Sequence, residues 1–141
     1  MTFQIQLNED AGYIDGTYSG NVDAGELNRA FAEIVECVRA NQEWHVLLDL
    51  SHMTGGHTLF DLHALAEKLT KISLPSQFRE AIVLPKGPGL ELHTEFWRNL
   101  CGISDINVKN FDDRESAEAW LAVWRLAEER RTAIDTDHDG R

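Results

Sequence analysis

The chain opens with apolar and polar residues that alternate with the period of a β-strand. Phe3, Ile5 and Leu7 alternate with glutamines, which predicts a strand with one buried face. A polar turn follows at residues 8–12. The next run, residues 13–19, is rich in aromatic and β-branched residues and ends at Gly20. We interpret these two segments as an antiparallel hairpin.

The rest of the chain alternates helical stripes with short apolar runs. Asp23 followed by Glu26 resembles a capping box and predicts the start of a helix. Residues 45–50 form a nearly continuous apolar run, which is typical of a central strand covered on both faces. Further strands are predicted at residues 79–84 and 106–111. A second helix is predicted from the stripe Leu62, Leu65, Leu69 and Ile72.

Two more helices complete the pattern. One begins at about Leu90 and ends at the predicted C-cap Gly102, and its inward residues are Leu92, Phe96, Trp97 and Leu100. The last helix begins after Asp112, which forms a second capping-box pattern with Glu115.

This order of elements predicts an α/β domain. Strands separated by helices indicate right-handed crossovers and a mixed, mainly parallel five-stranded sheet, with the N-terminal hairpin as its antiparallel edge and four helices. One domain over residues 1–129 is expected for 141 residues. From about Arg130 the apolar period is lost, so residues 130–141 are predicted to form a flexible acidic tail.

The predicted tail contains Asp135, Asp137 and Asp139, which match the opening D-x-D-x-D-G of a calcium-binding loop. The glutamate that would complete such a loop is missing from the sequence. We therefore interpret the segment as a solvated acidic tail, and whether it binds calcium stays open.

Charge and composition restrict the partners. The chain has 13 Lys and Arg against 24 Asp and Glu, a formal net charge of −11, which argues against binding to nucleic acids or anionic membranes. No secretory signal and no apolar stretch of about 20 residues is found, so no membrane insertion and a cytoplasmic location are predicted. Cys37 and Cys101 lack C-x-x-C spacing and are interpreted as buried thiols.

Three short motifs, in this order and spacing, carry a resemblance to a known family. They are Tyr18-Ser19-Gly20, Leu48-Asp49-Leu50-Ser51, and Phe111-Asp112 leading to Ala117-Glu118-Ala119-Trp120-Leu121. Over roughly residues 3–125 the chain resembles the STAS domains, the fold of anti-sigma-factor antagonists, and more closely their bacterial SpoIIAA-like branch. The resemblance implies a serine switch between the central strand and the second helix. Residues 53–60 lack the family's Asp-Ser-Ser-Gly-like motif, which leaves Thr58 as the possible phosphorylation site.

The loop at residues 54–58 is the main site candidate. It lies beyond the carboxyl end of the predicted central strand, where open α/β sheets bind ligands. Two glycines would allow close backbone approach, and the helix N-terminus would favour a small anion. The alternative is that the glycines only make the turn while Thr58 caps the helix. The candidate ligand-binding or partner-binding residues are Asp49, Ser51, Thr54, Gly55, Gly56, His57, Thr58 and Phe60.

Metal binding and catalysis have little support in the sequence. His52, His57 and His63 accompany Asp49 and Asp61, but no HxxxH or HExxH spacing occurs. No metal and no cofactor are predicted. The common nucleophile and phosphate-binding motifs are missing as well, so the chain is not expected to be an enzyme. A hydrolytic group would require Asp49, His52 and His57 to converge.

The last predicted helix carries more apolar surface than one packing face needs. Its apolar residues cover an arc of about 220°, against a stripe of about 100° for a single face. Trp120, Leu121 and Trp124 are expected to meet the sheet. A partner, most simply a second copy of the chain, would then cover Ala119, Val123 and Leu126, unless a neighbouring helix or the tail does so.

Two functions follow from these observations. The first is a non-enzymatic cytoplasmic regulatory or protein-interaction module of the STAS type. The alternative is a domain that binds a small apolar or anionic, lipid-like ligand in the crevice at the start of the second helix. An unfilled pocket beside Trp97, Phe60 and the glycine loop would favour the alternative, whereas a packed crevice would exclude it.

Overall fold

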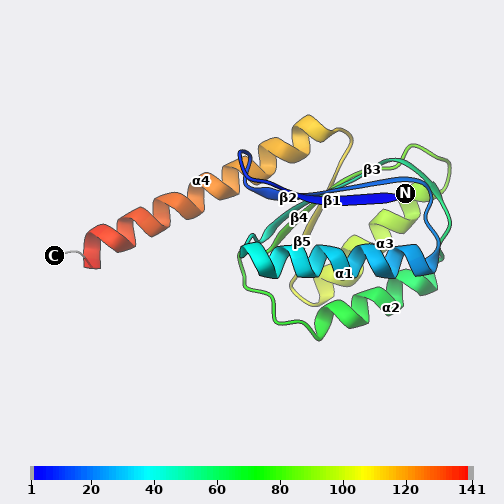
Figure 1. The fold of residues 1–141 in the computed structure, drawn as a ribbon, viewed down its shortest axis with the longest axis horizontal. Helices are drawn as coiled ribbons and strands as arrows, with labels where there is room; N and C mark the ends of the chain where they lie inside the picture. Colours follow the sequence, from blue (N-terminus) through cyan, green and yellow to red (C-terminus); the bar gives the residue numbers. More distant parts are fainter. Residues whose placement is uncertain (1, 140–141) are drawn as a thin grey trace.

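The computed structural model describes the backbone of residues 2–139 and the side chains of residues 2–131 (Figure 1). Nine elements follow one another in the predicted order. They are β1 (Phe3–Asn8), β2 (Tyr13–Asn21), α1 (Ala24–Asn41), β3 (His45–Gly55), α2 (Leu59–Thr70), β4 (Arg79–Val83), α3 (Leu90–Ile103), β5 (Asn107–Phe111) and α4 (Arg114–Asp139).

The five strands form one sheet in the order β1-β2-β3-β4-β5. The β1–β2 pair is antiparallel and the other three pairs are parallel, so the predicted mixed sheet is confirmed. Helices α1, α2 and α3 pack on one face, where they build the larger core. The other face packs on α4 through Ala117 and Leu121. The central strand β3 is therefore covered on both faces, as its continuous apolar run indicates.

Side-chain caps set the starts of α1 and α4. Asp23 accepts a hydrogen bond from the Glu26 amide (2.9 Å) and the Glu26 carboxylate accepts one from the Asp23 amide (3.4 Å), so the predicted capping box is confirmed. Asp112 is the predicted cap of the last helix, and this prediction is wrong by one residue. Asp113 accepts from the Ser116 amide (2.7 Å), because it is the residue that directly precedes the first helical turn.

Helix α3 presents the predicted stripe except at Leu92. Trp97 is buried, and Phe96 and Leu100 are partly buried against the core. Its buried residues are Leu90, Thr94, Trp97 and Cys101. Leu92 lies on the opposite side and is 59% exposed, so its predicted inward position is wrong. The predicted C-cap Gly102 is also wrong, because the helix continues to Ile103 and Ser104 is the C-cap. Of the two cysteines, Cys101 is buried and Cys37 only partly so.

Strand β3 extends five residues beyond the predicted loop boundary and ends at Gly55. Asp49 pairs with Thr17, but His52 pairs with Ser19, so β3 carries one extra residue there. Such a β-bulge reverses which face the following side chains occupy. Asp49, before the bulge, lies on the α4 face, and Met53, after it, is buried in the core under α1–α3.

Helix α4 continues to Asp139, beyond residue 129, where the predicted domain ends. Residues 128–131 are glutamates and arginines, which favour helix formation, so the helix continues although the apolar pattern has ended. The predicted tail is thus helical in its backbone through Asp139. The side chains of Asp135, Asp137 and Asp139 lie outside the described residues.

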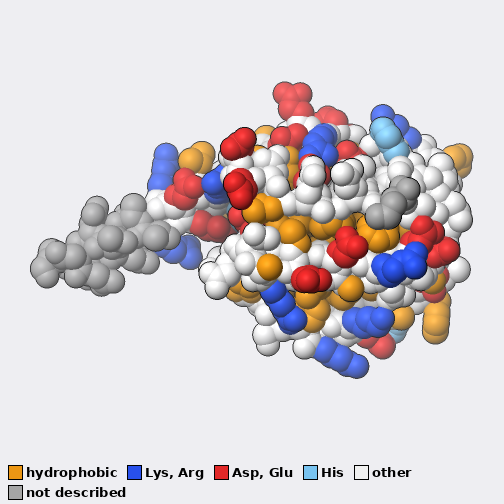
Figure 2. All heavy atoms as spheres, in the orientation of Figure 1, with side chains coloured by type: hydrophobic (Ala, Val, Ile, Leu, Met, Phe, Trp, Pro, Cys, Tyr) orange, Lys and Arg blue, Asp and Glu red, His pale blue; other side chains and the backbone are white. Residues whose placement is uncertain are grey.

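Figure 2 shows acidic and basic side chains interspersed with apolar atoms on the viewed face of the molecule. The excess of acidic residues is therefore not gathered there into a single patch. Over the described part of the chain, none of the helices is both long and apolar enough to cross a bilayer.

Candidate functional site

Thr58 is the N-cap residue of α2, and hydrogen bonds with the first helical turn hold it in place. Its hydroxyl accepts a hydrogen bond from the Asp61 amide (3.2 Å), and the Asp61 carboxylate accepts one from the Thr58 amide (2.8 Å). The interpretation of Thr58 as a helix cap is therefore confirmed. Phosphorylation of this exposed residue stays a prediction.

The glycines before Thr58 bring the loop against its own chain. Gly56 has a φ of +110°, and a Cβ there would lie 2.6 Å from the Val22 carbonyl oxygen. The Val22 amide donates to the Gly55 carbonyl (2.7 Å), and His57 Nδ1 lies 3.1 Å from the Val22 oxygen. The space beside Gly56, where the sequence predicts that a ligand approaches the backbone, is thus occupied by Val22 of the same chain. This contact fixes the loop to the segment before α1.

The β3 bulge divides the predicted site residues between the two faces of the sheet. Asp49 and Ser51 lie on the α4 side, whereas His57 lies on the side of α1–α3. Phe60 is 79% exposed, and Thr54 and Thr58 are exposed. The eight predicted residues therefore do not form one site.

No catalytic triad arises from the histidines near β3. The Ser51 hydroxyl donates to Asp49 (2.6 Å) and lies 3.2 Å from His52 Nδ1. A triad requires the imidazole between the acid and the hydroxyl, and here the hydroxyl lies between them. His57 contacts Val22 instead, so Asp49, His52 and His57 do not converge. Across the side chains that the structure describes, no three His, Cys, Asp or Glu residues are grouped to hold a metal ion.

Arg114, at the start of α4, connects that helix to the sheet. Its guanidinium forms ion pairs with Asp15 (2.5 Å), Asp49 (3.4 Å) and Glu118 (3.3 Å), and donates to the Tyr13 hydroxyl (3.3 Å). Burial alone would raise the pKa of Asp49, but the hydrogen bonds from Ser51 and the charge of Arg114 hold it below its usual value. We assign Asp49 to this structural cluster.

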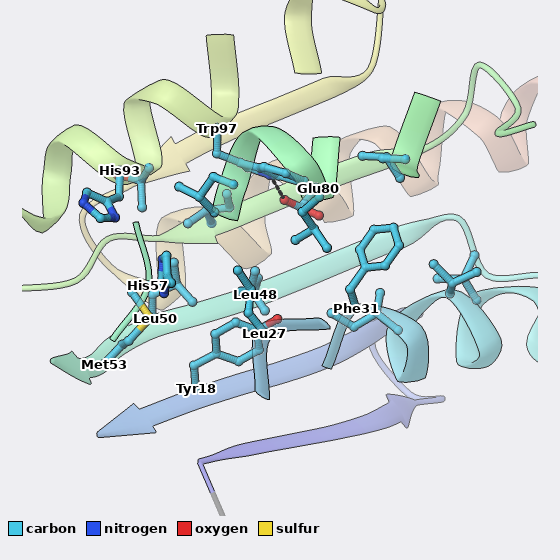
Figure 3. A pocket seen from close by; sticks show the side chains of 18 of the residues that line it. Tyr18, Leu27, Phe31, Leu48, Leu50, Met53, His57, Glu80, His93 and Trp97 are labelled. Atoms are coloured by element: carbon cyan, nitrogen blue, oxygen red, sulfur yellow. Dashed lines mark hydrogen bonds between the residues drawn. The ribbon is translucent and has the colours of Figure 1, made fainter. Parts of the chain in front are cut away.

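An apolar cavity of about 80 Å³ lies between the sheet and helices α1–α3 (Figure 3). Side chains of β2, β3 and β4 form its floor, and those of the three helices form its walls. Along α1 the lining extends from Leu27 to Arg39, about 18 Å at the helical rise of 1.5 Å per residue. The space is thus long and narrow. Trp97 lines it as predicted for a ligand pocket, but Phe60 does not.

Glu80 is the buried carboxyl group of this cavity. It lies on β4, is 7% exposed, and its Oε1 accepts a hydrogen bond from Trp97 Nε1 (2.8 Å). Burial raises the pKa of Glu80 to about 7, although the Trp97 hydrogen bond opposes the rise. Burial, with a smaller effect from the charge of Glu80, also raises the pKa of Tyr18 on β2.

Sequence reasoning missed Glu80, which we read only as part of an apolar strand at residues 79–84. The available signal was a lone acidic residue directly before Ala81, Ile82 and Val83. A carboxylate at such a position is either paired or exposed to a cavity, because an isolated buried charge is costly.

Two histidines lie at one end of the cavity. His57 and His93 have ring centroids 5.3 Å apart in an edge-to-face arrangement, and Figure 3 shows His57 near Met53 with His93 on α3 above it. Burial and the neighbouring His57 lower the pKa of His93. The lowered pKa favours the neutral form of the His93 imidazole at this end of the cavity.

Comparison with known proteins agrees with the observed fold. No curated protein matches the chain. A crystal structure of an uncharacterised Shewanella loihica protein with a SpoIIAA-like fold matches with a TM-score of 0.53 and 23% identity, covering 84% of this chain and 91% of that one. The SpoIIAA-like family model matches residues 13–122. The protein described here therefore belongs to the SpoIIAA-like family, as its STAS-like sequence motifs indicate.

Proposed function

We propose that this domain binds a small apolar molecule in the cavity under α1–α3. The observation that carries the proposal is the unfilled space itself. Protein interiors pack to the density of organic crystals, and an 80 Å³ void costs about 2 kcal/mol at 24 cal/mol per Å³. A core that retains such a space among large side chains such as Phe31, Phe78 and Trp97 is suited to an occupant.

The shape and lining define the class of ligand. The cavity is about half the size of an engineered cavity of about 150 Å³ that binds benzene, but it is elongated rather than round. A slender aliphatic chain matches this elongated form, and the part of a longer chain that exceeds the 80 Å³ space would extend toward the exposed Arg39 end of α1. The lining is almost entirely apolar, with the carboxyl of Glu80 inside and the guanidinium of Arg39 at the exposed end of α1. Of the two ligand types considered from sequence, the apolar one is favoured over the small anion.

Reduction of the cavity volume tests the proposal. Isothermal titration with 1-octanol is expected to show binding to the wild-type protein. Leu65→Phe places a larger side chain in the lining and is expected to weaken binding about 10-fold or more, because filled volume excludes part of the chain. Ile34→Phe does the same from α1. Leu92→Phe, at an exposed position of α3, is the matched control.

Two results would contradict the proposal. One is a wild-type protein that shows no heat of binding at saturating octanol. The other is a pair of cavity variants that bind octanol as well as Leu92→Phe does. Circular dichroism melts of all three variants ensure that lost binding does not reflect lost folding.

A second candidate, protein interaction, is favoured by the exposed face of α4. Val123 is 64% exposed and Leu126 55% exposed. Antiparallel pairing with a second copy would place Ala119 opposite Leu126 and Glu115 opposite Arg130, because residues at equal distances from the midpoint of such a pair face each other. A small residue then meets a large one and an acid meets a base, so the face is complementary to itself, which a two-fold interface requires.

We therefore propose a homodimer through α4. Light scattering after size-exclusion chromatography is expected to give twice the mass of the chain for the wild type and a single-chain mass for Leu126→Glu, since the variant places a carboxylate in the apolar contact. Leu92→Glu, at a similarly exposed position of α3, is expected to leave the mass unchanged. A monomeric wild type at high micromolar concentration would contradict the dimer.

A further inference from the structure

Glu80 has an unused hydrogen-bonding oxygen inside the cavity. Oε1 accepts from Trp97, while Oε2 has no hydrogen-bond partner among the residues that the structure describes. A buried carboxyl group with incomplete hydrogen bonding is costly to the folded state. Figure 3 shows the group beside Trp97 within the lining, where a bound molecule would meet it.

The hydroxyl of Tyr18 is a second unused polar group in the same cavity. Tyr18 is 4% exposed and lines the space from β2, and its hydroxyl has no hydrogen bond to any described residue. Buried tyrosine hydroxyls usually find a partner. Tyr18 lines the cavity from β2 and Glu80 lines it from β4, so both groups face the same enclosed space (Figure 3).

We propose that the ligand is an aliphatic alcohol whose hydroxyl donates to Glu80 and accepts from Tyr18. This inference rests on the proposed function, because it assigns the polar end of the molecule that the cavity binds. A hydroxyl is the small group that both donates and accepts. It can donate to the Glu80 carboxylate and accept from the Tyr18 phenol, while the alkyl chain contacts the apolar lining.

Other polar ends fit less well. A carboxylate would face the like charge of ionised Glu80, and an ammonium group has no lone pair to accept from Tyr18. An ether of the same size accepts but cannot donate. These differences allow head-group chemistry to be separated from simple apolar binding.

The test compares four probes that each have eight carbon atoms: 1-octanol, its isomer methyl heptyl ether, octylamine and octanoate. The titrations are made at pH 8, where Glu80 is mostly ionised. Isothermal titration is expected to show octanol binding about 10-fold more tightly than the ether, the usual range for a hydrogen bond to a charged group. In Glu80→Leu that ratio is expected to approach one, while the affinity for the ether is retained. Tyr18→Phe is expected to reduce the ratio partly.

Each outcome separates this inference from the proposed function. If the ether and octanol bind wild type equally, the hydroxyl assignment is overturned while cavity binding stands. Tighter binding of octanoate would place the polar end at Arg39, and tighter binding of octylamine would assign an amine, and either would overturn the inference. If none of the four probes binds, the proposed function itself fails. Retained ether binding by Glu80→Leu shows that the variant is folded.

Discussion

Between pH 4.5 and pH 8 the contribution of Glu80 to the free energy of unfolding is expected to fall by about 3 kcal/mol. Burial raises the pKa of this carboxyl from 4.5 to about 7 in the folded protein. Over the interval between these two values the folded state holds a proton that the unfolded state has released. Stability therefore decreases as the pH rises, and the decrease is complete above about pH 7.

Urea unfolding of the wild type and Glu80→Gln at half-unit steps of pH measures this effect. The glutamine keeps an acceptor for Trp97 Nε1 but does not ionise. The two proteins are expected to have similar stability near pH 4.5, and the variant is expected to be more stable by about 3 kcal/mol at pH 8. Stability curves that run parallel across this range would show that Glu80 titrates normally and is not buried as described.

Replacing Arg114 with methionine is expected to destabilise the fold by about 2 kcal/mol. Asp15 and Asp49 are only 14% and 15% exposed and would be left as neighbouring carboxylates without their cation. The full penalty for breaking a buried pair is larger, about 3–5 kcal/mol, but solvent screens Arg114, whose side chain is 34% exposed. Urea unfolding at pH 7 measures the loss.

The matched control is Arg125→Met on the same helix, where the arginine forms a surface pair with Glu129 and a change below about 1 kcal/mol is expected. Adding Asp15→Asn to Arg114→Met is expected to recover part of the loss. The lowered pKa of Asp49 means that its stabilising contribution is present above its unfolded pKa and is lost as the pH falls through the folded value. Equal effects of the two arginine variants would contradict the structural role of Arg114.

The fold was predictable because its signals are local. Strand and helix periods, the capping box at Asp23 and the continuous apolar run of residues 45–50 depend on neighbours in sequence. Errors arose where the outcome depends on packing between elements. The inward stripe of α3 is set by how the helix meets the sheet, so Thr94 is buried and Leu92 is not.

The candidate site was less predictable for a related reason. The β3 bulge depends on its register with β2, and this register decides that Asp49 and His57 lie on opposite faces. The cavity arises because the buried side chains do not fill the core completely. Hydrophobic periodicity shows which residues are buried, but not how well they fill the space. Glu80 was visible as an exception within an apolar strand, but its burial follows from the helices that cover it.

A crystal structure of the protein grown with 1-octanol tests the central claim most directly, because it locates the molecule. We expect continuous density for the alkyl chain between the sheet and helices α1–α3, with the hydroxyl within hydrogen-bond distance of Glu80. An empty or collapsed cavity in crystals that hold octanol elsewhere would contradict ligand binding at this site.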